Sequence, residues 1–325
     1  MSQTQNNPIK LQTVFMGTGQ FATIHLTQLL KENYNITSIY TQREDGNEKK
    51  QKDTQQNPIE QIAQKRNIPI RSPQKWNAET IEEFQKTKPD MVIVASYGKI
   101  LPEEVLGTPG FGCINAHPSL LPKYRGPSPI QNTLLNGDTE TGVTIMLMDT
   151  GMDTGPIIAQ EKSTITPQDT TPELLERLGQ QSANLLTKTL PQWVERTISP
   201  TKQDKTKATL CQMIDRQDGK IHWAMTTEEI INRYRALTPW PGIFTFWKKD
   251  GSNIRLKLIH VTQNEPLTNT QEKKQGEVFA HEGGVYIKTM NGSLEIEEIQ
   301  REGKKAMSIN EFIAGHNDFI NSILT

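Results

Sequence analysis

Residues 90–96 place five apolar side chains, Met91 to Ala95, in an uninterrupted row between an aspartate and a serine. A strand that shows one face to water alternates apolar with polar residues, and this row does not alternate. The pattern therefore predicts a central strand that is covered on both faces. Sheets built from such strands are mostly parallel, with helices packed on either side.

Predicted strands and helices alternate around this row. Apolar rows typical of strands occur at 11–16, 36–40, 68–70, 111–116 and 141–148, and amphipathic helices are predicted at 21–31, 59–66, 79–86 and 171–189. The alternation predicts an α/β N-terminal domain with a Rossmann-like, doubly wound sheet, in which ligands bind beyond the carboxyl ends of the strands. Only Gly17 and Gly19 of a dinucleotide fingerprint follow the first strand, so NAD binding is weakly indicated.

Polar residues stand where two of these strands end. Asn115 and His117 are two residues apart, so they share one face of an extended strand, about 7 Å from each other. Asp149 and Asp153 lie in the glycine-containing turn after the strand at 141–148. If the two strands are neighbours, an amide, an imidazole and a carboxylate meet, and such a set suits acyl transfer. Taken singly, each residue also has an ordinary structural explanation, such as a turn or a cap.

Four short segments in order carry a resemblance to a known family. They are Asn115-Ala-His117, Ser119-Leu-Leu-Pro122, Tyr124-Arg-Gly126 and the turn from Met148 to Gly155. With this spacing they resemble the signature of the formyltetrahydrofolate-dependent formyltransferases, and the resemblance extends over nearly the whole chain. It is greatest to the members that act on methionyl-tRNA. The resemblance implies transfer of a formyl group from 10-formyltetrahydrofolate to the α-amine of methionine esterified to initiator tRNA.

The resemblance also implies roles for particular residues. Asn115 and His117 would donate hydrogen bonds to the oxyanion of the tetrahedral intermediate, and Asp153 would orient His117 and take up a proton. Asp149 is the competing carboxylate, but the family motif places the catalytic aspartate at the second position, Asp153. The predicted folate-binding residues are Ser119, Leu120, Leu121 and Pro122. Arg125 anchors its loop or meets an anion, and no histidine or cysteine spacing indicates a metal.

Residues 41–57 form a long polar segment without apolar side chains. In the relatives that act on methionyl-tRNA, a basic insertion at this place grips the acceptor end, so Arg43, Lys49 and Lys50 are predicted to bind tRNA. This chain departs from that pattern, because residues 43–53 contain four basic and four acidic side chains. A solvated loop without a tRNA contact therefore remains an alternative.

The C-terminal third changes character. Short predicted strands between turns indicate a small, β-rich open barrel of OB type, so we expect a catalytic domain at 1–195, a basic linker at 196–210 and the barrel at 211–325. The linker has four basic residues and one acidic, which favours a polyanionic partner. Residues 205–325 hold 16 basic and 15 acidic side chains, so the aromatic residues there fit a core at least as well as a nucleic-acid surface.

Composition limits the remaining function classes. The 36 basic and 37 acidic residues nearly cancel, so the chain as a whole has no positive electrostatic potential that would attract nucleic acid. Its two distant cysteines indicate neither a disulfide framework nor a zinc cluster. With no apolar run of about 18 residues, we expect a cytoplasmic protein, and we expect it to be monomeric. Transfer to an amino sugar nucleotide, hydrolysis of formyltetrahydrofolate, and a catalytically silent nucleic-acid-binding module remain as alternative functions.

Overall fold

The computed structural model describes residues 10–42, 57–263 and 272–325. These residues form two compact units. The first comprises Met1–Pro129, Thr139–Ile165 and Leu174–Gln212, and the second comprises Ile130–Asp138, Thr166–Glu173 and Met213–Thr325. No helix within the described residues is long and apolar enough to cross a membrane.

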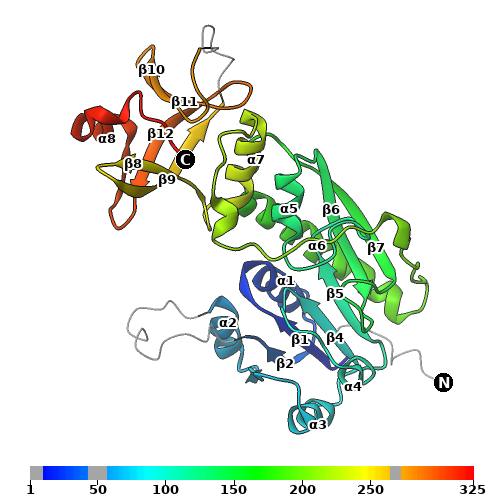
Figure 1. Cartoon of the computed structure of the whole chain (residues 1–325). Coiled ribbons are helices and arrows are strands. Elements are labelled where there is room, and N and C mark those ends of the chain that lie inside the picture. The colour runs from blue at the N-terminus through cyan, green and yellow to red at the C-terminus, as the bar shows by residue number, and fades with distance from the viewer. Residues whose placement is uncertain (1–9, 43–56, 264–271) are drawn as a thin grey trace, which may run out of the picture. The chain divides into compact units, whose positions relative to one another are not determined.

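The described part of the first unit contains a seven-stranded sheet with the order β3-β2-β1-β4-β5-β6-β7 (Figure 1). Its strands are β1 (Thr13–Gly17), β2 (Ile36–Tyr40), β3 (Ile70–Arg71), β4 (Met91–Ala95), β5 (Cys113–His117), β6 (Glu140–Leu147) and β7 (Ile157–Thr164). Strands β1 to β5 are parallel, and β6 and β7 are antiparallel additions at one edge. The predicted Rossmann-like α/β fold is confirmed.

Helices flank this sheet as the strand pattern predicted. They are α1 (Gly19–Lys31), α2 (Pro58–Arg66), α3 (Ala78–Lys86), α4 (Glu103–Leu106) and α6 (Thr171–Val194), of which α6 begins in the second unit. A further helix, α5 (Pro129–Leu135), belongs to the second unit from Ile130 on. Strand β4 is buried along its whole length. Its alternate residues enter two different cores: Ile93 packs in one with Leu26 and Leu186, and Val94 packs in the other with Phe84. Both faces of the strand are therefore covered.

A buried histidine links α1 to α6. His25 Nδ1 lies 2.8 Å from the Phe21 carbonyl oxygen, and Nε2 lies 2.9 Å from the Ser182 hydroxyl. Because a carbonyl only accepts, Nδ1 carries the proton and Nε2 accepts the hydrogen bond donated by Ser182. Desolvation by burial lowers the pKa of His25 to about 4, against the opposing effect of the Phe21 hydrogen bond, so the ring is neutral in the folded protein.

The described part of the second unit is built on an antiparallel sheet with the order β10-β11-β12-β9-β8, and β13 pairs with β12. Its elements are α7 (Thr227–Leu237), β8 (Ile243–Lys249), β9 (Ser252–Thr262), β10 (Val278–His281), β11 (Gly284–Lys288), β12 (Ser293–Arg301), β13 (Ala306–Ser308) and α8 (Ile309–Gly315). Trp247 is buried against Phe312 and Phe319, so these aromatic residues belong to the core. The prediction of a β-rich C-terminal fold is confirmed.

Candidate active site

Strand β5 ends in two polar side chains. Asn115 and His117 are 8% and 5% exposed, and they share a face because side chains two apart in a strand point the same way. Asn115 pairs with Val94 of β4 and Met146 of β6, so it lies in the middle of the sheet. The two-residue period of a strand predicted that these side chains share a face, and residues Cys113–His117 do form a strand.

Asp153 reaches the same place from the turn that follows β6. Its backbone is in the left-handed region, with φ 51°, a conformation that aspartate tolerates better than most residues. Gly155 closes the turn against β6, where an added Cβ would lie 1.8 Å from the Leu147 carbonyl oxygen. The turn needs a glycine at that point, and it folds the Asp153 carboxylate back onto β5.

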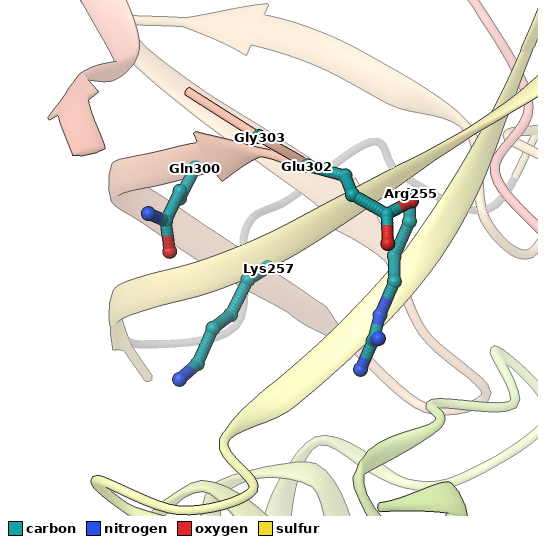
Figure 2. A pocket seen from close by; sticks show the side chains of 5 residues that line it. All are labelled: Arg255, Lys257, Gln300, Glu302 and Gly303. Carbon is teal, nitrogen blue, oxygen red and sulfur yellow. The ribbon is translucent and has the colours of Figure 1, made fainter. Parts of the chain in front are cut away.

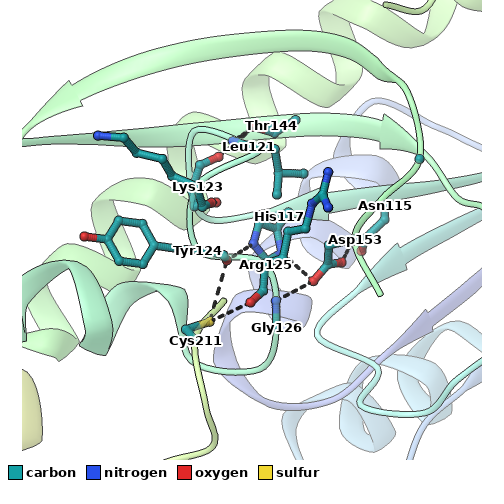
Figure 3. Close-up of polar contacts among 12 residues, drawn as sticks. Asn115, His117, Leu121, Lys123, Tyr124, Arg125, Gly126, Thr144, Asp153 and Cys211 are labelled. Carbon is teal, nitrogen blue, oxygen red and sulfur yellow. Dashed lines mark hydrogen bonds and ion pairs between the residues drawn. The ribbon is translucent and has the colours of Figure 1, made fainter. Parts of the chain in front are cut away.

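The three side chains meet at the end of β5 (Figure 3). Asp153 Oδ1 lies 3.4 Å from Asn115 Nδ2, and Oδ2 lies 3.7 Å from His117 Nδ1. Oδ2 also accepts a hydrogen bond from the Gly126 backbone N–H at 2.8 Å. We call Asn115, His117 and Asp153 the polar trio. An amide donor and an imidazole that both face one carboxylate can stabilise an oxyanion and move a proton.

The tautomer of His117 follows from its other contact. Nε2 lies 2.9 Å from the Tyr124 carbonyl oxygen, which only accepts, so Nε2 carries a proton. In the neutral ring, Nδ1 is then an unprotonated nitrogen directed at the Asp153 carboxylate. A proton taken up at Nδ1 would lie between the ring and Asp153, and His117 can therefore act as a base whose charged form has a partner.

Asp149, the competing carboxylate, stabilises the turn in which it lies. Its Oδ1 accepts hydrogen bonds from the Gly151 N–H at 3.1 Å and from the Thr154 hydroxyl at 2.6 Å, and the residue is exposed. This is the turn-stabilising use expected of an aspartate among glycines. The two aspartates therefore differ in their contacts: Asp149 bonds within its turn, and Asp153 faces Asn115 and His117. From the sequence, only the family resemblance separated them.

The predicted folate-binding segment follows His117 in the chain and consists of Ser119, Leu120, Leu121 and Pro122. Its polar groups bond within the protein: the Ser119 hydroxyl donates to the Lys123 carbonyl at 2.7 Å, and the Leu121 N–H donates to the Thr144 hydroxyl at 3.2 Å. Gln160 donates to the Leu121 carbonyl at 2.7 Å. These contacts shape the loop that carries the Tyr124 carbonyl, and direct contact with folate stays a prediction.

The segment 201–211 supports the site, and sequence reasoning missed it. Its Gln203 side chain contacts both the Arg125 guanidinium and the turn of Asp153, and its Thr209 hydroxyl accepts a hydrogen bond from the Tyr124 N–H at 2.8 Å. The sequence signalled only the net basic charge of this region. Arg43, Lys49 and Lys50, the predicted tRNA contacts, lie outside the described residues.

The second unit carries a shallow hollow of about 200 Å³ (Figure 2). It is lined by Arg255, Lys257, Gln300, Glu302 and Gly303. Arg255 and Lys257 are two residues apart on β9 and extend from the same face of the strand. The Arg255 guanidinium packs 3.7 Å from the Phe244 ring centroid, and burial, together with the charge of Arg255, lowers the pKa of Lys257. Two cations with one carboxylate make the hollow suited to an anion. Within the described ranges, no cluster of three or more histidine, cysteine or acidic residues could hold a metal ion.

Comparison with known proteins gives the same result for both units. Residues 10–190 match the model of the formyl transferase family, and residues 213–317 match that of the formyl transferase C-terminal domain. The methionyl-tRNA formyltransferase of Caldicellulosiruptor saccharolyticus is 40% identical over 310 residues, covering 94% of this chain and 97% of the relative. That of Geobacter metallireducens is 36% identical over 307 residues, covering 94% and 96%.

Solved structures share the fold at lower identity. The N-formyltransferase of Helicobacter canadensis, in complex with folinic acid and dTDP-3-aminofucose, is 21% identical with a TM-score of 0.64, covering 88% of this chain and 98% of that one. HypX of Aquifex aeolicus in complex with tetrahydrofolic acid is 15% identical with a TM-score of 0.62, covering 95% of this chain and 48% of that one. Since the N-terminal model matches more than half of the chain, and curated relatives above 30% identity extend over nearly all of it, the chain belongs to the formyl transferase family.

Proposed function

We propose that the protein transfers the formyl group of 10-formyltetrahydrofolate to the α-amine of methionine on initiator tRNA. The full-length relatives of at least 36% identity named above are methionyl-tRNA formyltransferases. The observation that carries the proposal is the polar trio, which gathers an amide, an imidazole and a carboxylate at the carboxyl end of β5. This is the edge of an α/β sheet at which ligands bind.

The attacking amine needs little activation. A free α-amine titrates near pH 8, and esterification of the adjacent carboxyl lowers that value, so much of the amine is unprotonated at neutral pH. Its attack on the formyl carbon forms a C–N bond and turns the carbonyl oxygen into an oxyanion beside a new ammonium. The Asn115 Nδ2–H group donates to this oxyanion, a contribution of about 3 kcal/mol for one well-placed donor.

His117 and Asp153 manage the proton. The unprotonated Nδ1 of His117 accepts the proton of the ammonium, and the charged ring is then held between the Tyr124 carbonyl oxygen and the Asp153 carboxylate. The same proton passes to N10 of the folate as the C–N10 bond breaks, which releases tetrahydrofolate and the formylated amine. Both N–H groups of this charged ring are engaged, Nε2–H by the Tyr124 carbonyl oxygen and Nδ1–H by the Asp153 carboxylate, so we assign donation to the oxyanion to Asn115.

Cationic side chains are the candidates for contacts with the phosphates of the acceptor tRNA. The Arg255 and Lys257 hollow offers two positive charges to a phosphate, and Arg43, Lys49 and Lys50 stay predicted contacts for the acceptor end. Ser119 to Pro122 stay the predicted folate-binding segment. We further propose a cytoplasmic monomer, which sedimentation of the purified protein tests.

The deciding experiment offers the purified protein 10-formyltetrahydrofolate with one of three acceptors. These are methionyl initiator tRNA, a dTDP-linked amino sugar, and water alone. We expect rapid formation of tetrahydrofolate only with the charged tRNA, together with formylmethionyl-tRNA. Equal turnover with the amino sugar or with water would assign the site to one of the alternative reactions, and failure to bind folate would support a nucleic-acid-binding module.

A further inference from the structure

We infer that Gln203 is a positioning residue for catalysis, because its single side-chain amide joins the loop of Arg125 and Gly126 to the turn of Asp153. The inference rests on the proposed function for the roles of the polar trio. Gln203 itself lies in the segment expected to be a linker, 50 residues beyond Asp153 in the chain and 78 beyond Arg125.

The amide of Gln203 bonds in two directions. Its oxygen accepts hydrogen bonds from Arg125 Nε at 3.1 Å and from Arg125 Nη2 at 2.7 Å. Its nitrogen donates to the backbone carbonyls of Asp153 at 2.9 Å and Gly155 at 2.7 Å. One acceptor and both donors of the amide are thus used, in a site where Arg125 is only 7% exposed.

Glutamine is the residue that this position requires. A glutamate would keep the acceptor for Arg125, but it would turn a carboxylate oxygen toward two carbonyl oxygens and lose both donors. A neutral amide also leaves the charge of the Arg125 guanidinium uncancelled beside the site. A methionine would fill the same space without any strong hydrogen bond.

The hydrogen bonds of Gln203 affect the position of the Asp153 carboxylate through the backbone of that residue. Its backbone has φ 51°, and such a conformation persists only when its surroundings over-determine it. Gln203 holds the backbone carbonyl of Asp153, and the Gly126 N–H holds the carboxylate at 2.8 Å. Gly126 is next to Arg125, so both links lead to the same loop. Without Gln203 the Gly126 bond to the carboxylate remains, but the backbone of Asp153 loses its link to Arg125, so the carboxylate can shift. A displacement of about 1 Å at a reacting group costs roughly a hundredfold in rate.

The backbone around Gln203 is held independently of its side chain. Thr201 and Ile157 exchange two backbone hydrogen bonds at 2.7 and 2.8 Å, and Cys211 N–H donates to the Arg125 carbonyl at 2.8 Å. An added Cβ at Gly126, whose φ is 116°, would lie 2.4 Å from the Cys211 carbonyl oxygen, so the segment packs closely on the loop. Changing the Gln203 side chain therefore leaves the segment attached and the fold intact.

The test compares Gln203→Met and Gln203→Glu with Gln181→Met. The matched control also loses two hydrogen bonds from a side-chain amide, to Glu161 Oε1 and the Lys162 carbonyl, on the exposed side of β7. We expect both Gln203 variants to lower kcat at least tenfold, with the KM for each substrate within about twofold of the unchanged protein. Gln181→Met should keep its kcat. A kcat within twofold of normal for either Gln203 variant, or equal losses in all three variants, would overturn the inference.

A double-mutant cycle separates positioning from general stability. If Gln203 acts through Asp153, adding Gln203→Met to Asp153→Ala should lower kcat by less than twofold beyond Asp153→Ala alone. Multiplicative losses, or losses that follow the melting temperature, would mean that Gln203 only stabilises the fold. The cycle uses whichever formyl acceptor the unchanged protein turns over, so a different acceptor would refute the proposed function and still decide the role of Gln203.

Discussion

Acidification should destabilise the first unit through His25. The ring is buried and neutral, with a pKa of about 4 against an ordinary value of 6.5. Between these values the unfolded chain binds a proton that the folded protein does not, so the free energy of unfolding falls as the pH is lowered from 6.5 toward 4 and is fully recovered above 6.5. At about 1.4 kcal/mol per pKa unit, the whole effect is roughly 3 kcal/mol, and about 2 kcal/mol is lost by pH 5.

Urea unfolding at several pH values measures this loss. Tryptophan fluorescence can follow the unfolding, because Trp76 and Trp193 belong to the same unit as His25. The perturbation is His25→Leu, which removes the titrating ring. It should be less stable than the unchanged protein at pH 7.5, because the Ser182 hydroxyl loses its partner, but its stability should fall less steeply below pH 6.5. The exposed His222 serves as control in His222→Gln, which should keep the steep dependence. Equal slopes for His25→Leu and the unchanged protein between pH 6.5 and 5 would refute the reasoning.

Three further outcomes are expected. Alanine at each member of the polar trio should lower kcat at least about a hundredfold with little change in melting temperature, and near-normal turnover in all three variants would remove the mechanism. Charge reversal in Arg43→Glu with Lys49→Glu and Lys50→Glu should raise the KM for tRNA more than that for folate, whereas equal effects would deny the loop a tRNA role. The double variant Arg255→Ala with Lys257→Ala should raise the KM for tRNA about tenfold and make that KM less dependent on salt. Initial rates at two salt concentrations measure both effects, and an unchanged dependence of the KM on salt would exclude a phosphate contact at this hollow.

Local side-chain patterns determined much of the fold. The unbroken apolar row at Met91–Ala95 predicted a strand covered on both faces, and β4 is such a strand. The two-residue spacing of Asn115 and His117 predicted that they share a face. Both predictions succeed because the period of a strand is a property of its own backbone, whatever surrounds it.

Contacts between distant segments could not be predicted in this way. The residue pattern left Asp149 and Asp153 as alternatives, and the family resemblance favoured Asp153. The left-handed turn closed by Gly155 gives the physical reason why the Asp153 carboxylate lies against β5. The tautomer of His117 likewise depends on a carbonyl seven residues away that a loop happens to direct at its ring.

The amino-acid sequence by itself therefore determined the α/β and β-rich fold classes of the two parts, the family, and the strand that carries Asn115 and His117. Tertiary structure alone decided that Gln203 joins two loops of the site and that Ser182 completes the bonding of His25, 157 residues away. Pairings of this kind arise from the packing of whole elements and from loop conformations. No periodicity along the chain encodes them, because each depends on where the rest of the fold places its partner.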